Sequence, residues 1–196
     1  MREIIYYVAS TVDGFIAHQD GSFTGFPWDD RFGAELRKRF PETFPAHLGG
    51  PASRGEANRS FDAVLMGRRT YEVGLREGIT NPYPSLDQYV FSRTLERSPD
   101  PHVTVTDEDP VATARVLKAQ PGKAIWLCGG GELASTLFAA GLVDRLILKL
   151  NPVVFGAGIP LLGSASAQRV LTLSESQVYP SGHALLDYRV TFTSQR

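Results

Sequence analysis

The segment AIWLCGGGELA, residues 124–134, indicates most clearly how this chain folds. Residues 124–128 are mostly apolar and predict a short buried strand, which three glycines follow. Residues 132–140 then predict a helix that ends before Gly141. A strand, a glycine turn and a helix N-terminus together present backbone N–H groups to a phosphate, and the spacing fits the dinucleotide-binding pattern G-x-G-x-x-G/A. The same pattern also occurs in a tight turn that binds no ligand, so other parts of the sequence have to distinguish the two.

Length and composition indicate an ordinary globular protein. A chain of 196 residues predicts one domain spanning residues 1–196. Cys128 is the only cysteine, which excludes an intramolecular disulfide or a cysteine-based zinc cluster and favours a cytoplasmic location. The net charge of −1 indicates neither a nucleic acid nor a membrane surface as partner. No run of 18 apolar residues occurs and a strand pattern directly follows Glu3, so we expect neither a membrane span nor a signal peptide.

Hydrophobic periodicity predicts strands that alternate with short helices. One helix begins at Asp29 or Asp30 and ends at Phe40, a second is capped by Thr70, and a third is capped by Asp109. Residues 41–60 have no usable period and predict a long loop, which serves either as a lid or subunit contact or as an ordinary surface excursion. The predicted strands are 4–9, 15–17, 61–66, 87–91, 103–106, 124–128 and 145–150, followed by a hairpin of 171–179 and 183–193.

This alternation implies an α/β fold with a mostly parallel central sheet of about eight strands, covered on both faces and closed by a C-terminal antiparallel hairpin. In such a sheet, ligands lie beyond the carboxyl ends of the strands. Three turns follow predicted strand ends, namely Gly67–Thr70, Ser92–Arg93 and Gly129–Gly131. We therefore expect these turns to meet on one ligand.

The charges on these turns favour one kind of cofactor. Arg68, Arg69 and Arg93 supply guanidinium groups that suit a phosphate monoester, and Ser92 adds a hydroxyl group. An NAD-selective site more often ends a strand with an acid that binds the ribose 2′-hydroxyl. The set therefore favours the 2′-phosphate of NADP, although each arginine taken alone is more simply explained as a solvated surface charge.

Several short motifs occur in an order that resembles the dihydrofolate reductase-like superfamily. They are Ser10-x-x-Asp13–Gly14, Leu65–Glu72, Val90–Leu95 and Cys128–Leu133. Three further motifs are similar to the reductase domain of the bifunctional riboflavin-biosynthesis deaminase/reductase, namely Leu142–Leu146, Asn151–Pro152 and Gly156–Leu161. The resemblance covers nearly the whole chain and implies a three-layer dihydrofolate reductase-like fold.

The resemblance implies that NADPH binds across the sheet. The expected adenosine-phosphate contacts are Gly67, Arg68, Arg69, Thr70, Ser92 and Arg93. The expected pyrophosphate contacts are Gly129, Gly130, Gly131, Glu132 and Leu133, and the expected nicotinamide contacts are Ala9 and Ile16. Asp13 is an expected substrate contact. Trp28 is another because it lies in a glycine-rich loop beside the proposed pocket, with a place in the core as the alternative.

The resemblance also implies an acid early in the first helix, because dihydrofolate reductases place a carboxylate there after a Pro–Trp pair. Here Pro27–Trp28 is followed by Asp29, Asp30 and Glu35, at a spacing that departs from the family pattern. We expect Glu35 or Asp30 to deliver a proton to the substrate, with helix capping or a solvated surface as the alternative for each. One cysteine cannot build the zinc site of the deaminase half, so we expect no metal.

The function implied by the resemblance is NADPH-dependent reduction of a small C=N or C=O substrate, as in a 5-amino-6-(5-phosphoribosylamino)uracil reductase. A dihydrofolate or pterin reductase and a non-catalytic NADPH-binding protein are the alternatives. An ordinary Rossmann domain ranks below them, because Leu150 stands near the position where that fold carries an acid. The apolar segment Val153–Leu162 favours a homodimer.

Overall fold

The computed structural model describes residues 1–54, 58–164 and 168–191 of the chain. Its strands and helices follow in chain order as β1 (Ile4–Ser10), β2 (Phe15–Ala17), α1 (Asp30–Arg39), β3 (Phe61–Gly67), α2 (Arg68–Arg76), β4 (Asp87–Phe91), β5 (Val103–Thr106), α3 (Pro110–Ala119), β6 (Ala124–Cys128), α4 (Gly131–Ala139), β7 (Arg145–Leu150), β8 (Ile159–Pro160), β9 (Val170–Val178) and β10 (Ala184–Thr191).

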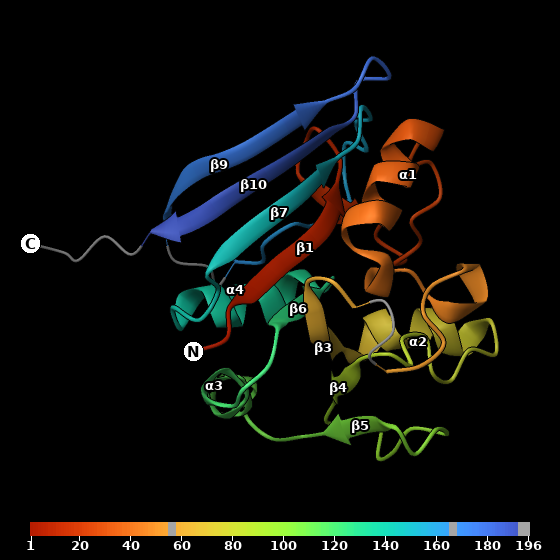
Figure 1. Ribbon diagram of the computed structural model, residues 1–196, viewed down its shortest axis with the longest axis vertical. Coiled ribbons are helices and arrows are strands. Elements are labelled where there is room, and N and C mark those ends of the chain that lie inside the picture. The colour runs from red at the N-terminus through yellow and green to blue at the C-terminus, as the bar shows by residue number, and fades with distance from the viewer. Residues whose placement is uncertain (55–57, 165–167, 192–196) are drawn as a thin grey trace, which may run out of the picture.

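The described residues form an eight-stranded main sheet in the order β5-β4-β3-β6-β1-β7-β10-β9 (Figure 1). The strands from β5 to β7 in this order are parallel, whereas β10 and β9 continue the sheet antiparallel. The predicted fold class and C-terminal hairpin are therefore confirmed, and the predicted end of the hairpin, Thr193, lies outside the described residues.

The sheet is the middle of three layers (Figure 1). Successive side chains of β1 point to opposite faces, so Tyr6 and Tyr7 belong to different clusters. The cluster around Tyr7 receives Leu36 from α1 and Tyr71 from α2. The cluster around Tyr6 receives residues from α3 and α4, among them Leu137. Each helix thus buries one apolar stripe, as the periodicity predicts.

Among the described residues, α1 and α3 begin with a side-chain cap, whereas α2 and α4 begin after a glycine. Asp109 caps α3 as predicted, and Asp29, one of the two predicted candidates, caps α1 by accepting the N–H of Phe32 at 2.7 Å. The prediction that Thr70 caps the second helix is wrong, because α2 already begins at Arg68. Strand β3 runs into α2 without intervening residues, so Gly67 occupies the capping position and Thr70 falls inside the first turn.

Two predicted loops contain more structure than expected. Residues 41–60 include the 3-10 turns Pro41–Thr43 and Ala46–Leu48. Glu42 is fully buried, and its carboxylate accepts the N–H groups of Ser60 and Phe61, both at 2.6 Å. This carboxylate ties the segment to the start of β3. In the second, residues 153–163, whose Gly/Pro content predicts a loop, β8 pairs with β2 beyond the carboxyl edge of the main sheet.

Candidate functional site

Strand order brings the three predicted turns to one edge of the sheet. Gly67 at the end of β3 lies in register with Phe91 at the end of β4, and β6 flanks β3 on its other side. A Cβ atom placed on Gly129 would lie 3.2 Å from Oγ1 of Thr70, so the first turn of α2 adjoins the glycine turn. The three turns therefore lie at the same edge of the sheet, and their meeting on one ligand stays a prediction.

The glycine turn exposes backbone donors. Gly129 and Gly130 have φ angles of 58° and 68°, in the left-handed region that favours glycine. Within residues 1–54, 58–164 and 168–191, neither N–H group has a hydrogen-bond acceptor. Both precede the N-terminus of α4, which adds positive potential, so the turn fits a pyrophosphate group.

Gly131 has a different role from the two glycines before it. A Cβ atom at this position would lie 2.4 Å from the carbonyl oxygen of Pro160 in β8. The missing side chain therefore permits close packing of α4 against β8. Glu132 is exposed in the first turn of α4 and Leu133 is buried in the core, so only their backbone N–H groups suit a phosphate.

The arginines at this edge differ in whether they already form an ion pair. Arg68 is half-exposed and pairs with Glu72 at 2.6 Å, one helical turn further along α2. Arg69 and Arg93 are exposed, and no hydrogen bond or ion pair involves their side chains in the described part of the chain. Ser92 is buried, and its Oγ accepts the N–H of Leu95 at 2.8 Å, which leaves its O–H free to donate. The free donors suit an additional phosphate.

The expected nicotinamide contacts come from two layers. Ala9 is half-buried near the end of β1 and, by the alternation of that strand, faces the layer of α1. Ile16 comes from β2 and packs against the cluster that α3 and α4 cover. The structure therefore places both residues near the carboxyl edge but does not bring them together on one face.

The three candidate acids at the first helix make different contacts. Asp29 is used as the helix cap. Asp30 is exposed and accepts the indole N–H of Trp28 at 2.8 Å. Glu35 is half-buried and lies beside the hairpin, where burial raises the pKa of Tyr179 and the charge of Glu35 raises it further. The charge of Asp29 also raises the pKa of Tyr179, and the catalytic roles of Glu35 and Asp30 stay predictions.

The two expected substrate residues occupy different environments. Asp13 accepts hydrogen bonds from the Thr11 hydroxyl at 2.5 Å and the Gly156 N–H at 2.7 Å, and these hold its pKa below the ordinary value. It therefore ties together two loops. Trp28 is 65% exposed and packs on α1 at Gly33, where a Cβ atom would lie 2.3 Å from the indole ring. A glycine inside the helix thus lets the indole ring lie against it.

Lys149 is a residue that sequence reasoning missed. It is half-buried near the carboxyl end of β7, in register with Ala9 of β1. Its Nζ lies 4.2 Å from the centroid of the Tyr7 ring. Burial lowers the pKa of Lys149 to about 8. The available signal was a single charge within the apolar run 146–150 of a predicted strand.

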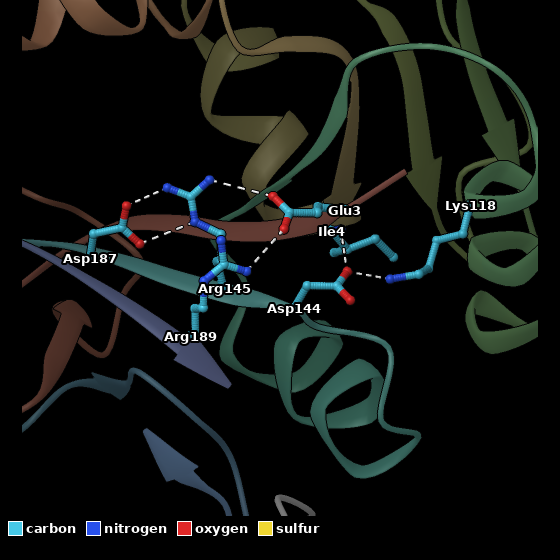
Figure 2. Close-up of polar contacts among 7 residues, drawn as sticks. All are labelled: Glu3, Ile4, Lys118, Asp144, Arg145, Asp187 and Arg189. Carbon is cyan, nitrogen blue, oxygen red and sulfur yellow. Dashed lines mark hydrogen bonds and ion pairs between the residues drawn. The ribbon is translucent and has the colours of Figure 1, made fainter. Parts of the chain in front are cut away.

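A separate cavity of about 410 Å³ lies at the opposite edge, where the parallel strands begin. Arg39 lines it and pairs with Glu175 at 2.7 and 2.9 Å. Arg145 also lines it and lies between Asp187 and Glu3 (Figure 2). Carboxylates already neutralise these guanidinium groups, so we assign them to the stability of the fold and the chemistry to the carboxyl edge.

The described residues contain neither a cluster of metal-ligating side chains nor a helix that could cross a membrane. No three His, Cys, Asp or Glu side chains come together there as they would around a metal ion. None of the described helices has the length and apolar character that crossing a membrane requires. The three turns at the carboxyl edge present N–H, hydroxyl and guanidinium donors, which suit an anionic ligand.

Known sequences are similar to this chain over nearly its whole length. A family model described as the RibD C-terminal domain matches residues 2–185. The protein YwjB of Bacillus subtilis is 30% identical over 178 residues, which cover 91% of this chain and 92% of that protein. The protein YyaP of the same organism is 28% identical over 198 residues, which cover 95% and 94% respectively.

Solved structures share the fold. A Shewanella sp. PV-4 protein named for riboflavin biosynthesis gives a TM-score of 0.70 at 22% identity, covering 98% of this chain and 100% of that one. A pyrimidine reductase-like protein from Corynebacterium diphtheriae gives 0.64 at 17%, covering 97% and 92%. The Thermotoga maritima diaminohydroxyphosphoribosylaminopyrimidine deaminase/5-amino-6-(5-phosphoribosylamino)uracil reductase gives 0.61 at 17%, covering 97% of this chain and 57% of that one.

Proposed function

Because this chain belongs to the RibD C-terminal domain family, we propose that it is an NADPH-dependent reductase of a small C=N or C=O substrate. The observation that carries the proposal is the carboxyl edge of the sheet. There the unpaired N–H groups of Gly129 and Gly130 adjoin Thr70, and neighbouring turns carry the free cations Arg69 and Arg93. Donors in this arrangement suit a dinucleotide that bears a pyrophosphate and a third phosphate.

In the proposed complex each group of the chain has one task. The N–H groups of Gly129 and Gly130, with the N-terminus of α4, hold the pyrophosphate. Arg69, Arg93 and the Ser92 hydroxyl bind the 2′-phosphate. The cofactor supplies the hydride when bound. The end of β1 at Ala9 lies where the reducible bond of the substrate would meet the nicotinamide.

The first substrate to test is 5-amino-6-(5-phosphoribosylamino)uracil, because the Thermotoga maritima protein that shares this fold is named for reducing it. Dihydrofolate and other pterins form the second class, favoured by Pro27–Trp28 and the acids of α1. A non-catalytic role would retain the same cofactor site without turnover.

Calorimetry with NADPH and NADH tests the cofactor, and NADPH oxidation in the presence of each substrate tests the reaction. We expect NADPH to bind at least about tenfold more tightly than NADH, because one charge-assisted contact contributes about 1.5–3 kcal/mol. Equal affinity for the two cofactors would contradict the assignment of the arginines. Tight NADPH binding without oxidation by either substrate class would favour the non-catalytic role.

We also propose that residues 1–196 act as one cytoplasmic domain that forms a homodimer. The lone cysteine, Cys128, is compatible with a reducing compartment. The segment Val153–Leu162 carries Val154, which is 65% exposed, and supports a symmetric contact between two copies.

A further inference from the structure

Lys149 is a cation without a counter-ion on the α1 face of the sheet. In the described part of the chain, no carboxylate or hydrogen-bond acceptor contacts its ammonium group, which lies over the Tyr7 ring. Its neighbour on the same face of β7, Ile147, is 1% exposed. Burying an unpaired charge destabilises a fold, and burial accordingly lowers the pKa of Lys149 to about 8.

The titratable groups that face Lys149 provide no negative charge. Tyr7 comes from β1 and Cys128 from the end of β6, and Tyr83 contacts Cys128 from the segment before β4. Burial raises the pKa of all three groups, that of Cys128 to about 12, so they are neutral near pH 7. On the other side, β10 places the apolar Leu185 in register with Lys149.

Two other cations of the sheet region show what a structural role looks like. Lys118 is buried and binds Asp144, which also accepts the N–H of Ile4 at 2.7 Å. Arg145, at the start of the same strand as Lys149, binds Asp187 and Glu3 (Figure 2). These pairs offset the desolvation of both partners and link separate elements. Lys149 forms no such link with any residue in the described ranges, so the described part of the fold gains no ion pair from its charge.

The position of Lys149 coincides with the proposed reaction centre. Lys149 and Ala9 are partners in the parallel pairing of β7 with β1. Ala9 is the residue that we expect beside the nicotinamide. β6, which carries the glycine turn, flanks β1 on the other side, so Lys149 lies two strands from the proposed pyrophosphate site and at the same edge of the sheet.

We propose that Lys149 receives the reducible end of the substrate and donates the proton that completes its reduction, an inference that rests on the proposed function. The substrate carbon of the C=O or C=N bond accepts a hydride from the dihydronicotinamide, which is thereby oxidised by two electrons. The substrate oxygen or nitrogen accepts a proton from Nζ of Lys149. Lys149 is left as a neutral amine and regains its proton from water. Lys149 thereby replaces Glu35 as the proposed proton donor.

A cationic donor also restricts the substrate class. An ammonium group stabilises negative charge that develops on oxygen or nitrogen during hydride transfer. It repels a substrate whose reducible end is already protonated, such as an iminium ion. The reducible end is therefore a carbonyl group or a neutral imine.

The first experiment compares Lys149→Met with a matched lysine variant, Lys38→Met, at an exposed position of α1. NADPH affinity is measured by calorimetry and turnover by NADPH oxidation with 5-amino-6-(5-phosphoribosylamino)uracil. We expect Lys149→Met to bind NADPH within about twofold of the natural protein and to lose about 100-fold or more in kcat, the usual size of positioned acid catalysis. The kcat of the natural protein should fall above about pH 8, where Lys149 loses its proton, and Lys38→Met should retain this profile.

The second experiment does not depend on turnover. Lysine side chains labelled for NMR are titrated in the natural protein, and the signal missing from Lys149→Met assigns Lys149. We expect this signal to titrate near pH 8, below the ordinary range of a lysine, and to shift when NADP⁺ is added. A Lys149 signal that titrates at the ordinary value, or that does not respond to NADP⁺, overturns the proposal.

The outcomes separate the two proposals. Absence of NADPH binding by the natural protein rejects the proposed function. Normal NADPH binding together with normal turnover by Lys149→Met rejects the role of Lys149 alone. Loss of turnover in Glu35→Gln with full turnover in Lys149→Met assigns the proton to Glu35. If the natural protein binds NADPH but does not reduce this substrate, the response of the Lys149 signal to NADP⁺ decides the question.

Discussion

At the scale of single residues, the cations of the carboxyl edge are not equivalent. Arg68 shares its charge with Glu72, whereas Arg69 and Arg93 have exposed guanidinium groups without a partner in the described ranges. A free guanidinium group can meet a phosphate without first breaking an ion pair. Cofactor selectivity is therefore expected to depend more on Arg69 and Arg93 than on Arg68.

Arg93→Gln tests this ranking. We expect its affinity for NADPH to fall by about 10- to 100-fold, which corresponds to about 1.5–3 kcal/mol for one charged hydrogen-bonding partner. Its affinity for NADH should remain unchanged, because NADH lacks the 2′-phosphate. Calorimetry with both cofactors measures the difference, and Arg115→Gln, at an exposed position of α3, serves as the control. An equal loss for both cofactors would place Arg93 away from the 2′-phosphate.

Asp13 gives a prediction about pH. The Thr11 hydroxyl first, and then the Gly156 N–H, lower its pKa in the folded protein. A carboxyl group with a lowered folded pKa stabilises the fold above its unfolded pKa and loses this contribution as pH falls through the folded pKa. We therefore expect Asp13→Asn to lower the melting temperature at pH 7, with the difference from the natural protein shrinking below about pH 4. A difference that is constant from pH 7 to pH 2 would show that the charge is not involved.

At the scale of elements, the glycines of two strand-to-helix turns at the carboxyl edge differ in whether an added side chain would disturb the fold. Gly67 has an extended backbone, and a Cβ atom there would meet nothing within 4 Å. Gly131 has no such space, because its Cβ atom would meet Pro160. Gly129 and Gly130 would be strained by any side chain because of their left-handed backbone. A side chain added at Gly67 is therefore expected to change ligand binding without changing the packing of the fold.

Gly67→Ala should fold normally and bind NADPH more weakly by about tenfold, because the added methyl group occupies space that the adenosine phosphate would use. Gly131→Ala should show the opposite pattern, with a melting temperature lowered by several degrees because the methyl group collides with backbone. Thermal unfolding and NADPH calorimetry on both variants provide the comparison. Unchanged NADPH binding by Gly67→Ala would indicate that the cofactor does not approach the start of α2.

At the scale of the whole molecule, two exposed apolar surfaces compete as the site of association. The proposed contact segment Val153–Leu162 carries Val154, and the edge strand β9 carries Leu173, which is 50% exposed. β9 is the last strand of the sheet, so its outer edge is also available for pairing. The segment is our preferred interface because Val154 is more exposed than Leu173 and has apolar residues on both sides in the sequence.

Val154→Asp should convert the dimer to a monomer, because a charge at the centre of an apolar contact has no partner there. Leu173→Asp, the matched variant on β9, should remain dimeric. Light scattering on the eluted protein measures both masses. A dimer that survives Val154→Asp and dissociates with Leu173→Asp would move the interface to the edge strand, and a natural protein that elutes as a monomer would reject the homodimer.

The sequence by itself determined the local features of this protein. The strands of the parallel sheet, the caps Asp29 and Asp109 and the glycine turn at Gly129 could be predicted because each depends on side chains within a few residues of one another. The prediction failed at Thr70, where the direct connection from β3 to α2 overrides the capping preference. Each turn of the proposed cofactor site directly follows a strand, so these turns could also be predicted from the sequence.

Only the tertiary structure decided which distant residues meet. It places β6 between β3 and β1, buries Glu42 against the start of β3, and sets Gly131 against Pro160. It also sets Lys149 beside Ala9 and over Tyr7, which no periodicity could indicate because the two strands are separated by most of the chain. Such contacts depend on the order of strands in the sheet, and that order is fixed by the burial of whole faces rather than by any short segment.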